Sequence, residues 1–203
     1  MSYWEHARPV RRVRAVDVDA AARAASDLLD EDGMSALTVR RLAARLGVAP
    51  ASLYSRVEGV DDLHDLALDA ALARDPEIEA ALAGADVVEL VVALYRHLCR
   101  HPWACRVIAA RAPRGPAYLR FSERLCALLV EGGTDDPLAL AYALSNLAIG
   151  SATTAPVAES ERLSPVASDI APLYARLHAA QQISAETVLR RALSALLRRP
   201  DAR

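Results

Sequence analysis

Four arginines occupy a stretch of the chain that contains no acidic residue. Between residues 34 and 57 they give a local net charge of +4, whereas the whole protein of 203 residues has a formal net charge of −2. Guanidinium groups pair with phosphates and can bind a guanine edge through two hydrogen bonds. Because the protein as a whole is not basic, any nucleic-acid site must be a local patch. We expect a face free of opposing carboxylates that carries Arg40, Arg41, Arg45 and Arg56.

The same window has the end signals of two short helices. Thr38 can cap the first helix, Gly47 can end it in the left-handed conformation, and Pro50 suits the first turn of the second. A helix, a tight turn and a second short helix form the helix-turn-helix arrangement, in which one helix crosses the phosphates while the next enters the major groove. An amphipathic helix from Asp17 to Gly33 would complete a three-helix unit.

The rest of the sequence predicts an all-α protein. Hydrophobic residues make up 53% of the chain but aromatic residues only 4%, and the excess of Ala and Leu favours helices over strands. A fourth helix should begin near Val60, and Asp75-Pro76 should form the hinge that leaves the N-terminal unit. Further helices are predicted near 86–100, 103–111, 116–131, 136–155, 166–180 and 185–198.

Basic residues also precede the first helix. Arg8, Arg11, Arg12 and Arg14 form an arm without acidic residues, and Arg12 and Arg14 are candidates to follow phosphates or to reach a minor groove. The alternative is a solvated terminus with no binding role.

Five segments keep a characteristic type and spacing of residues: Leu28–Gly33, Ala36–Ala43, Leu46–Val48, Ser52–Tyr54 and Asp62–Leu63. Together they resemble the DNA-binding domain of the tetracycline-repressor-like (TetR) family of regulators. The resemblance implies that Arg40 contacts a base and that Thr38 caps its helix and offers its hydroxyl and amide to a phosphate. It also places Ser52, Ser55 and Arg56 on the exposed side of the recognition helix, where Tyr54 packs and touches a phosphate.

Two positions depart from the family pattern. Many members have a phosphate-binding lysine at the start of the fourth helix, where this chain has Val60 with Asp61 and Asp62 after it. Ala49 stands where a capping Ser or Thr usually precedes the recognition helix. We therefore expect one backbone contact to be missing and the sequence preference to differ from the family norm.

Several short motifs lie in the later part of the chain: Tyr95-Arg96-His97, His101-Pro102-Trp103, Gly115-Pro116, Glu123, Glu131-Gly132-Gly133 and Gly150. Through these residues the later part resembles the tetracycline-repressor type of C-terminal domain. That resemblance implies a ligand cavity among the middle helices and a homodimer formed by two late helices. It gives three regions: a basic arm at 1–16, a helix-turn-helix DNA-binding domain at 17–74, and a helical ligand-binding and dimerisation domain at 75–203. Arg111 stands where tetracycline-binding relatives have a metal-coordinating histidine, so chelated tetracycline is not the expected effector.

Apolar surface independently predicts the dimer. No charged residue occurs between 137 and 158, and the segment carries enough small polar residues to favour a buried interface helix over a bilayer span. A twofold dimer would set two recognition helices about 34 Å or a multiple apart and would bind a palindromic operator. The last helix has an apolar face made of Val188, Leu189, Ala192, Leu193, Leu196 and Leu197.

Bulky rings with a few polar tips suit a pocket for a small organic molecule, although each such residue could also be ordinary core. The candidate lining residues are Trp103, Val107, Tyr118, Phe121, Leu125, Tyr142 and Asn146.

A rival site is the group His97, Cys99, His101 and Cys105, whose four-residue spacings could gather soft metal ligands on one helix face. Pro102 should break that helix, and a second Cys/His group is missing, so we assign no metal and no cofactor. Three cysteines and no apolar leader suggest a reduced, cytoplasmic setting.

The leading hypothesis is a ligand-responsive transcriptional repressor that partners with double-stranded DNA, a small-molecule effector and a second copy of itself, and not with a membrane. The alternatives are a metal or redox sensor that uses the cysteine–histidine group and a helical dimer without DNA binding. No catalytic arrangement stands out, so we do not expect an enzyme.

Overall fold

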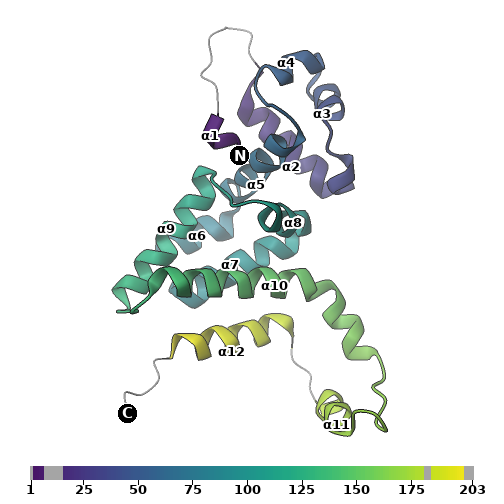
Figure 1. Cartoon of the computed structure of the whole chain (residues 1–203), viewed down its shortest axis with the longest axis vertical. Coiled ribbons are helices and arrows are strands. Elements are labelled where there is room, and N and C mark those ends of the chain that lie inside the picture. Colours follow the sequence, from purple (N-terminus) through teal and green to yellow (C-terminus); the bar gives the residue numbers. More distant parts are fainter. Residues whose placement is uncertain (1, 7–15, 181–183, 199–203) are drawn as a thin grey trace.

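The computed structural model describes residues 2–6, 16–180 and 184–198, with the backbone alone at 159–163. These residues form helices and no strand, in an elongated molecule with a small unit at one end and a larger helical body below it (Figure 1). The all-α prediction is confirmed. The small unit contains α2 (Val18–Asp32), the 3-10 helix η1 (Met34–Ala36), α3 (Val39–Leu46), α4 (Pro50–Tyr54) and α5 (Val60–Ala73).

Helices α2 and α3 begin and end where the sequence predicted, and α4 and α5 begin where it predicted. The Asp17 side chain accepts a hydrogen bond from the amide of Asp19 at the start of α2. Thr38 caps α3, and Gly47 ends it with φ 66°, a left-handed conformation that favours glycine. Leu42 and Leu53 are fully buried, so α3 and α4 are held together by the same core that packs α2 against α5.

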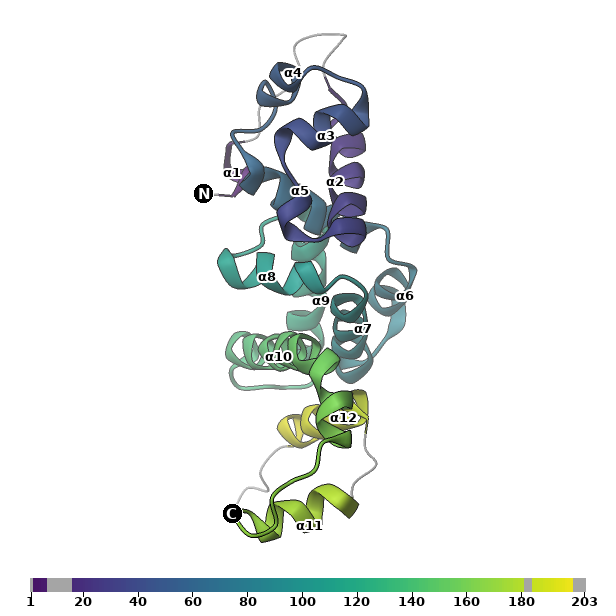
Figure 2. The ribbon, with the colours of Figure 1, turned by 90° about the vertical axis from the view of Figure 1, so that its right-hand side faces the viewer.

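The body is built around α7, which packs between α6 and α10 (Figure 2). The core beneath these helices includes Leu90, Leu94, Leu98, Phe121, Leu125 and Leu144. Helix α12 packs on α10 and α7 through Leu189 and Leu193. The elements of the body are α6 (Pro76–Gly84), α7 (Val87–Arg100), α8 (Pro102–Ala110), α9 (Pro116–Glu131), α10 (Pro137–Leu163), α11 (Pro172–Ala180) and α12 (Ala185–Leu197).

Four expectations about elements were wrong or incomplete. Helix α6 was missed, although Asp75 caps it through the amide of Glu77 and Pro76 stands in its first turn. Helix α10 continues past Pro156 instead of ending there, and α11 begins at Pro172 rather than near 166. The short α1 (Tyr3–His6) was also missed, because its stability comes from docking on α5 and not from its own sequence.

The N-terminal segment docks on α5 through two carboxylates. The Ser2 hydroxyl and the Tyr3 amide both donate to Oδ2 of Asp65, at 3.0 and 2.9 Å. The His6 ring lies 3.0 Å from Asp62, and the Tyr3 side chain is buried. This segment therefore belongs to the core and is not a free tail. Residues 7–15, which include the predicted arm arginines Arg12 and Arg14, lie outside the described residues.

Helix α10 packs against other helices on one side and is exposed to solvent on the other. By length and composition alone its segment Pro137–Ala158 could cross a membrane, but in this structure it packs against α7, α9 and α12. Its outer side leaves large apolar residues exposed, among them Leu138, Tyr142 and Val157. Helix α11 contributes no buried residue, and Ile170 just before it is 82% exposed.

Asp69 of α5 joins the small unit to the body. Its Oδ1 accepts hydrogen bonds from the amides of Ala117 and Tyr118, at 2.7 and 3.3 Å, and so caps the N-terminus of α9. Burial raises the pKa of Asp69, while these two amides act in the opposite direction. A Cβ on Gly115 would lie 2.2 Å from Oδ1 of Asp69, so this close approach requires glycine.

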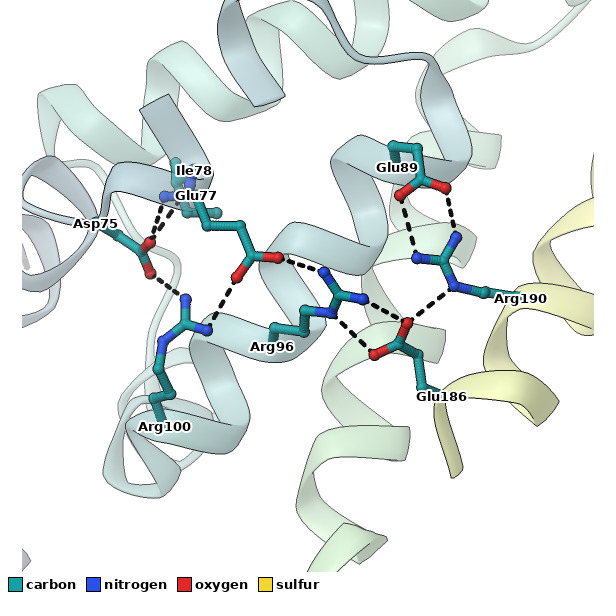
Figure 3. Close-up of polar contacts among 8 residues, drawn as sticks. All are labelled: Asp75, Glu77, Ile78, Glu89, Arg96, Arg100, Glu186 and Arg190. Carbon is teal, nitrogen blue, oxygen red and sulfur yellow. Dashed lines mark hydrogen bonds and ion pairs between the residues drawn. The ribbon is translucent and has the colours of Figure 1, made fainter. Parts of the chain in front are cut away.

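A ladder of ion pairs continues from Asp75, which caps α6, to the last helix (Figure 3). Asp75 and Glu77 accept from Arg100, and Glu77 also accepts from Arg96 at 2.6 Å. Arg96 then pairs with Glu186 of α12 through two hydrogen bonds, at 2.8 and 2.7 Å. Arg190 completes the ladder by joining Glu186 to Glu89 of α7.

His97 lies fully buried behind this ladder, with Nδ1 2.6 Å from the Asp75 carboxylate. Burial lowers the pKa of His97 to about 4, against the opposing effect of Asp75, and the nearby His101 and Arg100 add to the lowering. Burial would raise the pKa of Asp75, but hydrogen bonds from Arg100 and His97 outweigh it and lower that pKa to about 2.

We predict that Gly115→Ala lowers the free energy of unfolding by about 1 to 3 kcal/mol, because the new methyl group must displace the Asp69 cap. Urea denaturation measures the change. Gly84→Ala is the control, since a Cβ there meets nothing within 4 Å. Equal stabilities of the two variants would contradict the close approach.

We further predict that acid destabilises the protein through His97. Its folded pKa of about 4 lies below the usual 6.5, so the unfolded chain binds the proton more readily, and stability falls as the pH drops from about 6.5 to about 4. The loss from this group is about 2 to 3 kcal/mol. Asp75 adds a further loss as the pH drops from about 3.8 to about 2.

Unfolding free energies measured across this range should have a smaller pH slope in His97→Gln, which keeps a donor for Asp75 but does not titrate. An unchanged slope between pH 6.5 and 4 would show that His97 is not the group responsible.

Candidate nucleic-acid interface and pocket

The outer face of α3 and α4 carries the residues predicted to bind DNA. Thr38, Arg40 and Ser55 are exposed, and Tyr54 is 56% exposed. Within the described part of the chain, the exposed Arg40 forms no ion pair. Ser52 and Arg56 are half-buried. Five of these six side chains lie on or beside α3 and α4, and Arg56 follows directly after them.

Local hydrogen bonds set the shape of this face. The Thr38 hydroxyl accepts from the Arg41 amide at 3.1 Å, and the Ser55 hydroxyl donates to the Ser52 carbonyl at 2.7 Å. Ala49 provides no side-chain cap for α4, as the sequence predicted. The first amides of α4 therefore depend on other partners, and the Ser55 hydroxyl is already engaged at the other end of the helix.

The expectation of a face without opposing carboxylates was wrong for two of the arginines. Arg45 forms two hydrogen bonds with Glu31, both at 2.6 Å, and Arg41 pairs with Asp32. The hydrogen bond from Arg45 lowers the pKa of Glu31. Both acids lie at the end of α2, outside the acid-free window, and the turn after Gly33 brings them back beside α3.

Acidic residues near Val60 face partners inside the molecule. Asp61 lies 2.5 Å from Arg111, and Asp62 is buried, where it accepts from the Glu58 amide at 2.7 Å. Val60 itself is 36% exposed. The start of α5 therefore presents an apolar side chain where many family members have a cation, while Arg111 ties the end of α8 to α5.

A pocket of about 360 Å³ lies between α8, α9 and α10 in the body. Tyr118, Leu125, Tyr142 and Asn146, all predicted candidates, are among its lining residues. None of the other lining residues was predicted from the sequence, because no single motif marks them. They are Ile108, Ala112, Pro113, Arg114, Leu119, Ser122, Cys126, Leu138, Ala141, Ser145 and Ile149.

The remaining three candidates do not line this pocket. Val107 and Phe121 are 3% and 1% exposed and belong to the core, which was the alternative stated for every bulky residue. Trp103 is also buried, and its Nε1 donates to Asp30 of α2 at 2.6 Å. The shared reason is that these side chains point inward from α8 and α9, whereas the pocket opens beside α10.

The pocket lining combines apolar walls with polar tips. Burial raises the pKa of the Tyr118 phenol, and Tyr142 nearby adds to the effect, so the phenol stays protonated at neutral pH and can donate. Arg114, Ser122, Ser145 and Asn146 supply further polar groups. Such a lining suits an aromatic molecule that carries a few oxygen atoms.

The cysteine–histidine group is not assembled. His97 is bonded to Asp75 and His101 to Asp30, while Cys99 is exposed and Cys105 is buried. Burial raises the pKa of the Cys105 thiol, which makes it a poor metal ligand and nucleophile. Among the described residues, no three His, Cys, Asp or Glu side chains are placed to hold a metal ion.

Two family descriptions match successive parts of the chain. Residues 22–56 match the bacterial regulatory proteins of the tetR family, and residues 84–184 match the tetracyclin repressor-like C-terminal domain. The first covers α3 and α4, and the second covers the helices around the pocket.

Individual proteins agree with these matches. A transcriptional regulator from Saccharopolyspora erythraea is 39% identical over 137 residues, which are 66% of this chain and 58% of that protein. The repressor DrrR1 from Streptomyces coeruleorubidus is 33% identical over 64% of this chain and 50% of its own length. The matched region thus spans only about half of these curated relatives.

A solved structure resembles almost the whole chain. The Streptomyces coelicolor TetR family protein ActR, in complex with (S)-DNPA, has a TM-score of 0.72 and 28% sequence identity, over 91% of this chain and 96% of that one. The helix-turn-helix geometry, both family matches and this shared fold lead to one conclusion. The chain belongs to the TetR family of bacterial transcriptional regulators.

Proposed function

We propose that this protein is a cytoplasmic repressor that binds a palindromic DNA operator as a homodimer and leaves it when a small aromatic molecule binds. The observation that carries the proposal is a helix-turn-helix unit with exposed Arg40 and Tyr54, attached to a separate body that contains a pocket of about 360 Å³. We assign DNA binding to 17–74 and ligand binding with dimerisation to 75–203.

Arg40 is the residue we assign to base recognition. Its guanidinium is exposed on α3 beside the helix N-terminus, where Thr38 and the free amides suit a phosphate. Arg41 and Arg45 share their charge with Asp32 and Glu31, so they contribute to phosphate binding only when those surface pairs open. DNA binding by this chain therefore depends on few cations.

Exposed apolar surface supports the homodimer. Helix α10 leaves Leu138 and Val157 exposed, and α12 leaves Val188 and Leu196 about half-exposed. These residues lie on two adjacent helices at the end of the molecule opposite α3 and α4 (Figure 1). A second copy would remove this surface from water. It would leave the small unit of each copy, which contains α2 to α5 and is called the reading unit from here on, free to contact DNA.

The similar protein ActR supports a small-molecule effector, since its structure was solved in complex with (S)-DNPA. In our chain the pocket offers the rings of Tyr118 and Tyr142 together with Ser145 and Asn146. A ligand that changes the spacing of the two reading units would release the operator, because it binds one arrangement of the dimer better than the other.

Selection of duplexes from random DNA at 150 mM salt tests operator binding. We expect a palindrome with half-sites about one helical turn or a multiple apart. Arg40→Ala should weaken binding to the selected duplex by about 1 to 3 kcal/mol, as measured by fluorescence anisotropy, because a base contact is lost. Arg106→Ala, which removes an exposed arginine of the body, is the control. If selection enriches no sequence, the protein is not an operator-binding regulator.

The pocket is tested with (S)-DNPA as the probe ligand. We expect it to release the protein from the selected duplex, and we expect Ser145→Trp to abolish this release because the indole fills the pocket. Binding of DNA by Ser145→Trp without the probe is the control for folding. Release that persists in Ser145→Trp would contradict the assigned pocket, and no release from the wild type would contradict the ligand class.

A further inference from the structure

The last turn of α2 has an unusual charge pattern. Asp30, Glu31 and Asp32 are consecutive, and this turn contains no basic residue. The C-terminal end of a helix carries partial negative charge, so carboxylates at this end are electrostatically unfavourable. Each of the three side chains, however, accepts hydrogen bonds from another helix, and these contacts account for their presence.

Asp30 attaches this turn to the body. Its Oδ1 accepts from Nε1 of Trp103 at 2.6 Å and lies 2.7 Å from Nδ1 of His101. His101 precedes α8 and Trp103 is in its first turn, where it is only 4% exposed. The end of α2 is therefore fixed to the beginning of α8.

The two following residues attach the same turn to α3. Glu31 binds the Arg45 guanidinium through both carboxylate oxygens, and Asp32 pairs with Arg41. Successive side chains of a helix point about 100° apart, so three consecutive residues can reach partners on different sides. One turn of α2 thus lies between α8 and the helix that carries Arg40.

Helix α8 also reaches the pocket. Ile108 near its end lines the cavity, as do Ala112, Pro113 and Arg114 directly after the helix. Trp103 and Ile108 are on one helix of nine residues. A displacement of α8 by a molecule in the pocket would therefore move the groups that bind Asp30.

Two helices, α5 and α2, attach the reading unit to the body, and together they restrict its rotation. Helix α5 already joins the reading unit to the body through Asp69, which caps α9, and through Asp65 near Arg111. A unit held along one helix can still rotate about that helix. The contact of Asp30 with Trp103, made by a different helix, restricts this rotation and so fixes the direction in which α3 points.

We propose that Asp30 is a positioning residue for DNA recognition, which couples α8 to α3 through the segment Asp30–Asp32. The inference rests on the proposed function and adds a defined contact by which the body sets the orientation of the reading unit. Asp30 acts through α2 and Trp103 without touching the DNA.

Matched variants of α2 provide the first test. Asp27 and Asp30 are both partly exposed carboxylates on this helix, with side chains 45% and 31% exposed, but Asp27 pairs with Arg74 at the end of α5, at 3.3 Å, and not with α8. We expect Asp30→Ala to weaken binding to the selected duplex by about 5-fold or more, and Asp27→Ala to change it by less than about 2-fold. Asp30→Asn, which keeps an oxygen for the Trp103 Nε1–H, should restore most of the affinity.

A spectroscopic test separates coupling from simple stabilisation. The chain has two tryptophans, so Trp4→Phe leaves Trp103 as the fluorescent reporter. Provided that this variant binds the selected duplex as the wild type does, we expect the duplex, but not scrambled DNA, to change the Trp103 emission. Adding Asp30→Ala should remove this response, while Asp27→Ala should leave it intact.

The outcomes distinguish this inference from the proposed function. If selection enriches no duplex, the regulator assignment fails. If a duplex is enriched, the positioning role of Asp30 is refuted when Asp30→Ala and Asp27→Ala bind it equally well, or when its binding leaves the Trp103 emission unchanged. Failure of Asp30→Asn to restore affinity, with all variants folded by circular dichroism, would also refute it.

Discussion

The structure depends on carboxylates of α5 that are buried or half-buried and must each find a partner. An unpartnered buried charge is very unfavourable, so every such group constrains the element that supplies its donors. Asp62 and Asp65 hold the N-terminal segment, Asp65 also lies near Arg111 after α8, and Asp69 caps α9. One helix thereby sets the positions of its neighbours in both the reading unit and the body.

Charge pairing also determines which arginines on the outer face of α3 and α4 are available to bind DNA. Four arginines gave the window 34–57 its positive charge, but Arg41 and Arg45 are held by acids from the end of α2. Exposed pairs of this kind contribute little to stability, so their main effect is on orientation and on which cations remain available. Arg40 stands out on this face because it is exposed and, within the described residues, makes no ion pair.

The body has a closed apolar core and, separate from it, apolar side chains that are exposed on its outer helices. Its core around α7 is closed, with Leu90, Leu94 and Phe121 almost inaccessible to solvent. The sides of α10 and α12 that face away from α7 retain exposed leucines and valines, and the pocket opens beside α10. Helix α10 is therefore in contact with the core and the pocket, and it borders the surface where we propose that a second copy binds.

The sequence alone determined the helical class, the start and end of α2 and α3, and the family. These features depend on local signals, such as the Asp17 and Thr38 caps and the left-handed Gly47, which act between residues close in the chain. The sequence could not reveal that Glu31 and Asp32 neutralise two arginines, that Trp103 binds Asp30, or that Val107 and Phe121 belong to the core. Helix α1 was missed for the same reason. Each of these depends on contacts between helices far apart in sequence, which only packing in three dimensions brings together.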